Sequence, residues 1–217
     1  MQPRLALHPL LEQTIELARG GWVVHQPSWL DRATAHTLFQ RLLGEIAWQR
    51  GSIQLFGKQV LEPRLIAWAG EMPYRYSGRT LAPATRPACL NQVWLLAETF
   101  AGVSFNHVLM NRYRTGDDSM GWHADTEPEL GQNPPVLSLS LGATRRFLMK
   151  PKRHLPAEAT REWRLTDGSV LFMGGSTQHH YRHSVPRQRG VAGERLNLTF
   201  RRVLCPPGAA VPDAGAH

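Results

Sequence analysis

The chain has 217 residues, of which 42% are hydrophobic, enough for one substantial core and too few for two comfortable domains. Its 25 lysines and arginines exceed its 17 acidic residues, giving a formal net charge of +8, a balance that suits a polyanionic partner and also serves solubility. No stretch approaches the roughly 20 apolar residues of a membrane span, and residues 1–10 lack an export signal's apolar core. Cys89 and Cys205 are too few for a disulfide framework. We expect a soluble, cytoplasmic monomer without membrane contact.

Two amphipathic segments in the first half of the chain predict helices. The first prediction covers residues 29–48, with Ser28 as the N-cap and apolar residues recurring at helical spacing. The second run begins near residue 90 and ends at Gly102, a residue suited to terminating a helix. Its predicted apolar face consists of Leu90, Val93, Leu96, Ala97 and Phe100. We expect both helices to pack on one sheet.

From residue 105 onward, short alternating or apolar segments predict strands. Turn signals such as 115–117, 133–135 and 174–175 separate them. The predicted strands are 106–113, 136–141, 146–149, 163–165, 169–173, 180–185 and 196–203. Many short strands at this spacing indicate a sandwich or a jelly-roll barrel. Residues 206–217 are rich in Pro, Gly and Ala, and we expect this tail to be disordered.

His123 and Asp125 are candidate metal ligands because residues two apart on an extended strand point to the same side. Two histidines and one carboxylate leave three positions open on an octahedral ion, as non-haem iron(II) requires. Zinc would prefer a closed tetrahedral site. The triplet alone also fits an ordinary surface strand, and spacing does not select the third ligand. Its candidates are His154, His179, His180 and His183.

Residues 195–201 alternate polar and apolar side chains, so their polar members share one strand face. Those members are Arg195, Asn197, Thr199 and Arg201. Upstream, Asn111 and Tyr113 share a face in the same way. Guanidinium, amide and phenol groups suit the two carboxylates of a small diacid. Taken alone, the pattern also fits an edge strand with its polar side in water.

Four motifs in this order resemble the AlkB family of iron(II)- and 2-oxoglutarate-dependent dioxygenases. They are Asn111-Arg112-Tyr113, His123-x-Asp125, His183 before Val185-Pro186, and residues 195–201, and the resemblance spans about residues 53–203. It implies an α+β, mainly β fold: a double-stranded β-helix, or jelly roll, with N-terminal helices packed on one sheet. The implied single dioxygenase domain covers 1–205, with a substrate-recognition hairpin and lid at about 50–80 and the β-helix core at 105–203.

The resemblance also implies the chemistry of the site. Iron(II) would be bound by His123, Asp125 and His183. The co-substrate 2-oxoglutarate would be held by Asn111, Tyr113, Arg195 and Arg201, with Asn197 and Thr199 supporting the same pocket. Molecular oxygen would be the oxidant.

Within the family, Phe56-Gly57-Lys58 and residues 73–78 resemble the hairpin and base pocket of the branch that acts on duplex DNA. By this resemblance Phe56 is a stacking wedge beside Gly57 and Lys58, Tyr74 and Tyr76 line the flipped base, and Glu127 faces the substrate. Thr126 departs from the branch, where an acidic residue is typical, and this puts the lesion preference in doubt. Alternatively, Phe56 belongs to a hairpin core and both tyrosines pack a sheet.

The function implied is oxidative removal of alkyl groups from N-alkylated DNA bases, coupled to conversion of 2-oxoglutarate to succinate and releasing formaldehyde from methylated bases. The expected partner is alkylated double-stranded DNA, with single-stranded DNA as a further candidate and the strand preference left open. Basic clusters at 150–154, 182–189 and 201–202 favour nucleic acid. Two alternatives stay open: the same chemistry on RNA or protein, and a non-catalytic nucleic-acid-binding module.

Overall fold

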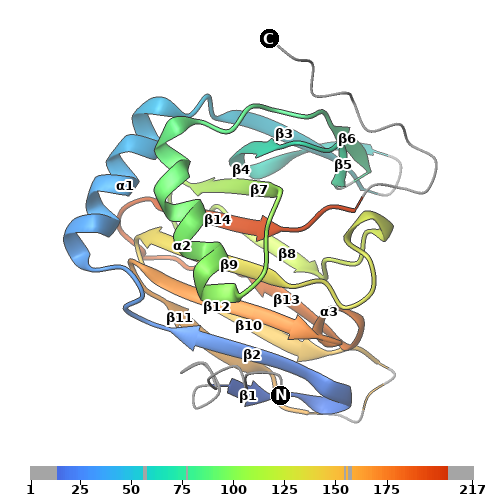
Figure 1. Cartoon of the computed structure of the whole chain (residues 1–217). Helices are drawn as coiled ribbons and strands as arrows, with labels where there is room; N and C mark the ends of the chain where they lie inside the picture. The colour runs from blue at the N-terminus through green and yellow to red at the C-terminus, as the bar shows by residue number, and fades with distance from the viewer. Residues whose placement is uncertain (1–13, 56–57, 77, 154, 156–157, 205–217) are drawn as a thin grey trace, which may run out of the picture.

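The computed structural model describes residues 14–204 except 56–57, 77, 154 and 156–157, and the side chains of 53–59 lie outside the description. Two β-sheets face each other, and helices α1 (Arg32–Glu45) and α2 (Asn91–Ala101) cover the outer side of the larger one (Figure 1). This arrangement confirms the predicted mainly β jelly roll with helices packed on one sheet. None of the described helices is long and apolar enough to cross a bilayer.

The larger sheet has eight strands and the smaller has four. In spatial order the larger contains β1 (Thr14–Glu16), β2 (Gly21–Gln26), β12 (Ser169–Gly175), β9 (Val136–Gly142), β14 (Arg195–Arg201), β7 (His107–Tyr113), β4 (Lys58–Gly70) and β3 (Gln49–Leu55). The smaller contains β11 (Arg161–Leu165), β10 (Arg145–Pro151), β13 (Tyr181–Val185) and β8 (Met120–His123). A separate pair, β5 (Tyr74–Tyr76) and β6 (Arg79–Leu81), follows β4.

The first predicted helix exists, but it is shorter than 29–48 and its predicted N-cap is wrong. The side chain of Asp31 accepts a hydrogen bond from the Thr34 N–H at 2.9 Å, so Asp31 and not Ser28 caps α1. The helix stops at Glu45 because Ile46 adopts an extended backbone.

The second helix ends as predicted, where Gly102 takes a left-handed conformation with φ 65°. Its apolar face differs from the prediction, because Trp94 is buried while Leu96 is 38% exposed. The indole of Trp94 packs edge-on against Phe200 of β14, with ring centroids 5.4 Å apart.

The predicted strands of the second half are present with bounds shifted by a few residues, and β1 and β2 are strands that the sequence analysis missed. β8 ends at His123, so Asp125 lies beyond the strand on which the His-x-Asp pair was placed. His180 is likewise outside its predicted strand, because it ends the short helix α3 (Thr177–His180).

β14 is an interior strand, so the interpretation of 195–201 as an edge strand is wrong. It is paired on one side with β9 and on the other with β7, and all its residues are buried. Its apolar residues Leu196, Leu198 and Phe200 join the core beneath the helices. The alternating polar residues therefore face the opposite way, into the space between the two sheets.

Candidate iron and co-substrate site

The structure brings His123, Asp125 and His183 together. β8 and β13 pair antiparallel with His123 directly opposite His183, and one ligand atom from each of the three residues lies within 4.8 Å of the others. Among the other described candidates for the third ligand, His179 is exposed and His180 ends α3, and neither joins this cluster. His154 lies outside the described residues.

The surroundings orient each candidate ligand. Nδ1 of His123 lies 2.9 Å from the Gly121 carbonyl, a contact that leaves Nε2 free for a metal. Oδ1 of Asp125 accepts a hydrogen bond from Nη2 of Arg201 at 3.1 Å, and the Asp125 N–H donates to Oε1 of Gln178 at 3.0 Å. Oδ2 of Asp125 is buried and has no hydrogen-bond partner among the described residues, so it is available to a cation.

The electrostatics of the cluster favour metal binding at neutral pH. Burial alone would raise the pKa of Asp125, but Arg201 and the two imidazoles outweigh it and lower that pKa to about 2. Burial, assisted by His123, lowers the pKa of His183 to about 3, and burial also lowers the pKa of His123. The carboxylate is therefore ionised and the imidazoles are neutral, the forms that bind metals. The donor set fits iron(II).

A cavity beside this cluster contains a buried cation with open donors. Arg195 is 1% exposed; its Nη2 donates to the Ser140 hydroxyl at 2.8 Å, and its guanidinium lies 5.0 Å from the centre of the Tyr113 ring. Among the described residues, its Nε and Nη1 have no hydrogen-bond partner and no carboxylate pairs with it. Burial lowers its pKa. An unpaired buried guanidinium is costly, so this end of the cavity fits a carboxylate of 2-oxoglutarate.

The other predicted pocket residues bond mainly to one another. Nδ2 of Asn197 donates to the Ser138 hydroxyl at 2.8 Å, while its Oδ1 accepts from Thr199 at 3.0 Å and from Asn111 at 3.3 Å. Oδ1 of Asn111 accepts in turn from Nε of Arg64 at 2.7 Å. These amides form the floor of the pocket. The cavity is lined by the predicted ligand and co-substrate residues together with Leu109, Met120, Ser138, Phe147, Met173 and Val185.

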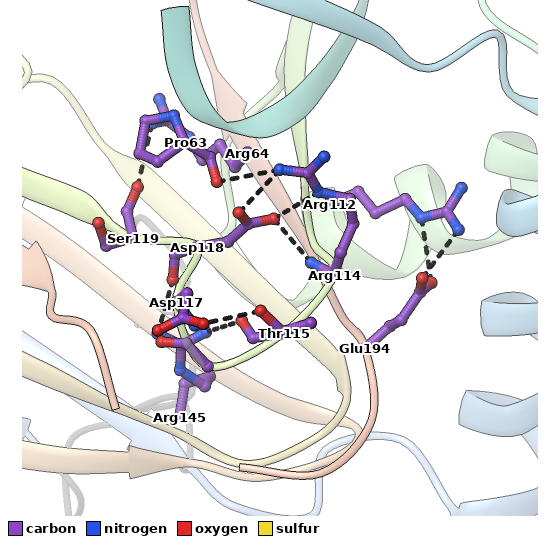
Figure 2. A network of polar contacts seen from close by, with 11 residues as sticks. Pro63, Arg64, Arg112, Arg114, Thr115, Asp117, Asp118, Ser119, Arg145 and Glu194 are labelled. Atoms are coloured by element: carbon purple, nitrogen blue, oxygen red, sulfur yellow. Dashed lines mark hydrogen bonds and ion pairs between the residues drawn. The ribbon is translucent and has the colours of Figure 1, made fainter. Parts of the chain in front are cut away.

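Buried arginines that the sequence analysis missed hold the loops around the site. Arg145, 1% exposed, donates to the carbonyls of Thr115 at 3.1 Å, Asp118 at 2.8 Å and Pro186 at 2.7 Å. Figure 2 shows Arg145 beside the loop between β7 and β8, where Arg114 also pairs with Asp118 at 2.8 Å. Because Pro186 follows β13, these bonds tie together the strands that carry His123 and His183. The sequence around Arg145 and Arg114 does not indicate that these arginines would bind the loops of the site.

The predicted substrate side chains that the structure describes do not line the cavity, and Tyr74 and Tyr76 belong to the neighbouring hydrophobic cluster that includes Leu109. Tyr74 and Tyr76 on β5 are both buried, and the hydroxyl of Tyr76 is bonded to Arg64, which also pairs with Glu62 at 2.8 Å. Glu127 is partly buried; burial raises its pKa, and the neighbouring Asp125 raises it further. Phe56 and Gly57 lie outside the described residues, as does the side chain of Lys58, the first residue of β4.

A jelly roll that encloses a His-Asp-His cluster beside a cationic cavity has the features of a 2-oxoglutarate-dependent iron oxygenase. The family model of the 2OG-Fe(II) oxygenase superfamily matches residues 22–201. The "Alpha-ketoglutarate-dependent dioxygenase alkB homolog 3" of Rattus norvegicus is 37% identical over 202 residues, covering 88% of this chain and 67% of the relative. The "DNA oxidative demethylase ALKBH2" of Homo sapiens is 36% identical over 183 residues, covering 80% of this chain and 70% of the relative.

A solved structure agrees with this fold. OsALKBH1 matches with a TM-score of 0.57 and 20% sequence identity, over 83% of this chain and 97% of that one. The chain belongs to the AlkB family of the 2OG-Fe(II) oxygenase superfamily. This membership confirms the predicted enzyme class, an Fe(II)/2-oxoglutarate-dependent dioxygenase, and its cofactors Fe(II), 2-oxoglutarate and O2.

The first prediction is that His183 binds the metal and that His180 does not. We expect His183→Ala to weaken Fe(II) or Co(II) binding by about 100-fold or more, because even residues that only support a metal ligand change affinity by about 10–100-fold. His180→Ala is the matched control and should bind the metal like the wild type in titration calorimetry. Normal metal affinity in His183→Ala with lost affinity in His180→Ala would show the assignment to be wrong.

The second prediction concerns Arg195. Its replacement by alanine should cost about 2–5 kcal/mol of co-substrate binding, because it leaves a buried carboxylate without its cation. At about 1.4 kcal/mol per decade, KM for 2-oxoglutarate should rise by about 30-fold or more. Arg146→Ala is the control, since Arg146 is exposed and pairs with Glu162 at 2.7 Å. An unchanged KM for 2-oxoglutarate in Arg195→Ala, accompanied by weaker DNA binding, would contradict the assignment.

Proposed function

We propose that this dioxygenase removes alkyl groups oxidatively from N-alkylated bases in DNA. The observation that carries the proposal is that a chain 36% identical to a DNA oxidative demethylase has a His-Asp-His cluster beside a cavity with open, buried guanidinium groups. The formal charge of +8 is in keeping with a nucleic-acid substrate.

The residues around the cavity would have different roles in the reaction. His123, Asp125 and His183 would hold the iron, while Arg195 would receive a carboxylate of 2-oxoglutarate. With iron and 2-oxoglutarate bound, the site would supply an oxidation that consumes O2, converts 2-oxoglutarate to succinate and carbon dioxide, and hydroxylates an N-linked methyl group. Arg201 keeps Asp125 ionised and oriented, and the buried walls exclude water. The hydroxylated methyl group then leaves the base as formaldehyde.

A cationic surface outside the cavity supports contact with the DNA backbone. Lys150 on β10 and Arg182 on β13 are direct cross-strand partners, and neither pairs with a carboxylate in the described part of the chain. Like charges placed directly opposite each other are unfavourable, and a phosphate would relieve that repulsion. Arg201 does not contribute to this surface, contrary to the predicted basic cluster at 201–202, because it is buried against Asp125.

The substrate base must leave the helical stack to reach the iron, which costs a few kcal/mol in a duplex. Tyr74 and Glu127, close to Asp125 and Arg201, would then contact the extruded base. Action on duplex DNA rests on the sequence pattern Phe56-Gly57-Lys58, in which Phe56 would fill the vacated space. β3 and β4 pair as far as Leu55, the residue before this pattern, and Lys58, its last residue.

The test of the function is formaldehyde release from oligonucleotides that contain 1-methyladenine or 3-methylcytosine, with Fe(II) and 2-oxoglutarate added. We expect formaldehyde and succinate in equal amounts from DNA, and neither from Asp125→Ala. Release from methylated RNA but not from DNA would favour the RNA alternative. Turnover of 2-oxoglutarate without formaldehyde from any methylated oligonucleotide would overturn the proposal.

The strand preference is tested separately by Phe56→Ala. A stacked aromatic contributes about 1–3 kcal/mol, so repair of duplex DNA should slow by roughly ten- to a hundredfold. Single-stranded DNA needs no unpairing, so its repair should change far less. If both rates fall equally and the melting temperature falls with them, Phe56 belongs to the hairpin core and the wedge hypothesis is wrong.

A further inference from the structure

His107 is a buried histidine on the strand that forms one wall of the cavity. It is the first residue of β7 and alternates with Leu109, Asn111 and Tyr113, which line the cavity, while His107 itself is not among the lining residues. Side chains two apart on a strand share a face, so the imidazole lies on the cavity side of the sheet. Only 1% of His107 is exposed.

The imidazole of His107 has polar atoms without partners. Neither Nδ1 nor Nε2 makes a hydrogen bond within the described part of the protein. Burial, with a smaller effect of Arg201, lowers the pKa of His107 to about 3, so the ring is neutral and offers one donor and one acceptor. Buried polar atoms are nearly always satisfied in folded proteins, so a histidine with two open nitrogens indicates a polar ligand or a bound water.

The position of the ring is constrained by close packing. His107 is the cross-strand partner of Arg201 on β14, and its ring centroid lies 4.8 Å from that of Tyr74. On its other side it pairs with Gly70 of β4, where an added Cβ would come within 2.6 Å of the His107 ring. A side chain at position 70 would clash with the imidazole, so the absence of one at Gly70 allows the ring to pack between Gly70 and Tyr74.

Two further polar groups lie near Arg201 and Asp125. The hydroxyl of Tyr74 and Oε2 of Glu127 are buried, and these two side chains interact with each other. Both residues interact electrostatically with Arg201 and Asp125, as His107 does with Arg201. These groups therefore gather beside Arg201, which lines the cavity.

We propose that His107 is a specificity-determining residue that hydrogen-bonds the polar edge of the substrate base, directly or through one water. This inference rests on the proposed function. A neutral imidazole can accept from the exocyclic amino group of a methylated adenine or cytosine and can donate to a ring carbonyl. Its neutrality matters because 1-methyladenine and 3-methylcytosine are cations, which a protonated histidine would repel.

The experiment compares the wild type with His107→Phe, which keeps an aromatic ring and removes both nitrogens. We expect kcat/KM for 1-methyladenine and 3-methylcytosine DNA to fall by about ten- to a hundredfold, because a base edge then loses its partner. KM for 2-oxoglutarate and its turnover without DNA should not change. The melting temperature should stay constant or rise, since an apolar ring replaces unsatisfied polar atoms.

A matched control and a rescue variant complete the test. His25→Phe is the control: His25 lies on β2 of the same sheet, its Nε2 is also unpartnered among the described residues, and three strands separate β2 from β7. Its replacement should leave kcat/KM unchanged. His107→Asn restores a donor and an acceptor in a smaller side chain, so it should recover part of the activity that His107→Phe loses.

Two results would overturn the assignment of His107. One is a wild-type kcat/KM in His107→Phe. The other is a fall in melting temperature in both His107 variants with parallel losses in DNA repair and in DNA-independent 2-oxoglutarate turnover, which would show a purely structural role. A wild-type protein that turns over 2-oxoglutarate but releases no formaldehyde from methylated DNA would instead overturn the proposed function, and the ligand of His107 with it.

Discussion

The contact between Arg201 and Asp125 is the interaction on which the site depends. It joins the end of β14 in the larger sheet to the segment after β8 in the smaller one, at 3.1 Å between Nη2 and Oδ1. Removing both charges from water is costly, so such a buried pair is poor evidence for added stability. Its consequence is chemical: it keeps the carboxylate ionised and occupies one of its oxygens, while Oδ2 remains open beside the imidazoles of His123 and His183.

The hydrogen bonds around the cavity separate residues that support the site from residues that can bind a ligand. Asn111, Asn197 and Thr199 are bonded to one another, and Arg145 is bonded to loop carbonyls. These groups have partners and hold the walls in place. By contrast, Arg195 retains open donors in a buried setting. Unsatisfied buried groups are costly, and a protein keeps them where a ligand completes them.

The open groups differ between the two ends of the site. At the Arg195 end they are cationic and fit a carboxylate, whereas beside Arg201, whose Nε and Nη1 are also open, the neutral imidazole of His107 adds a donor and an acceptor that fit the edge of a base. Arg64 connects the co-substrate pocket to β5, because it is bonded to Asn111 and to Tyr76. A change at Tyr76 can therefore reach the co-substrate pocket through buried hydrogen bonds.

Local patterns in the sequence were sufficient for those features that depend on neighbours along the chain. The alternation of 195–201 placed four polar side chains on one strand face, the strands from residue 105 onward were recognised within a few residues, and Gly102 marked the end of α2. The order of the motifs also indicated the family and its cofactors. The choice of Ser28 as N-cap failed because the helix begins at Arg32, so the first free backbone donors, such as the Thr34 N–H, lie within reach of Asp31 and not of Ser28.

Only the tertiary structure decided which of these local features meet. Residues 195–201 form an interior strand because β7 and β9 pair with it on either side. Spacing alone could not select His183 from its neighbours, because that choice follows from the pairing of His183 on β13 with His123 on β8. Arg64, Gln178 and His107 gave no signal in the sequence. Arg64 contacts Asn111, 47 residues away, and Gln178 contacts Asp125, 53 residues away. His107 pairs with Arg201 across two strands, and its buried ring nitrogens have no partner among the described residues. Neither such contacts nor such burial is encoded in the residues next to them, because burial and pairing are properties of the folded chain as a whole.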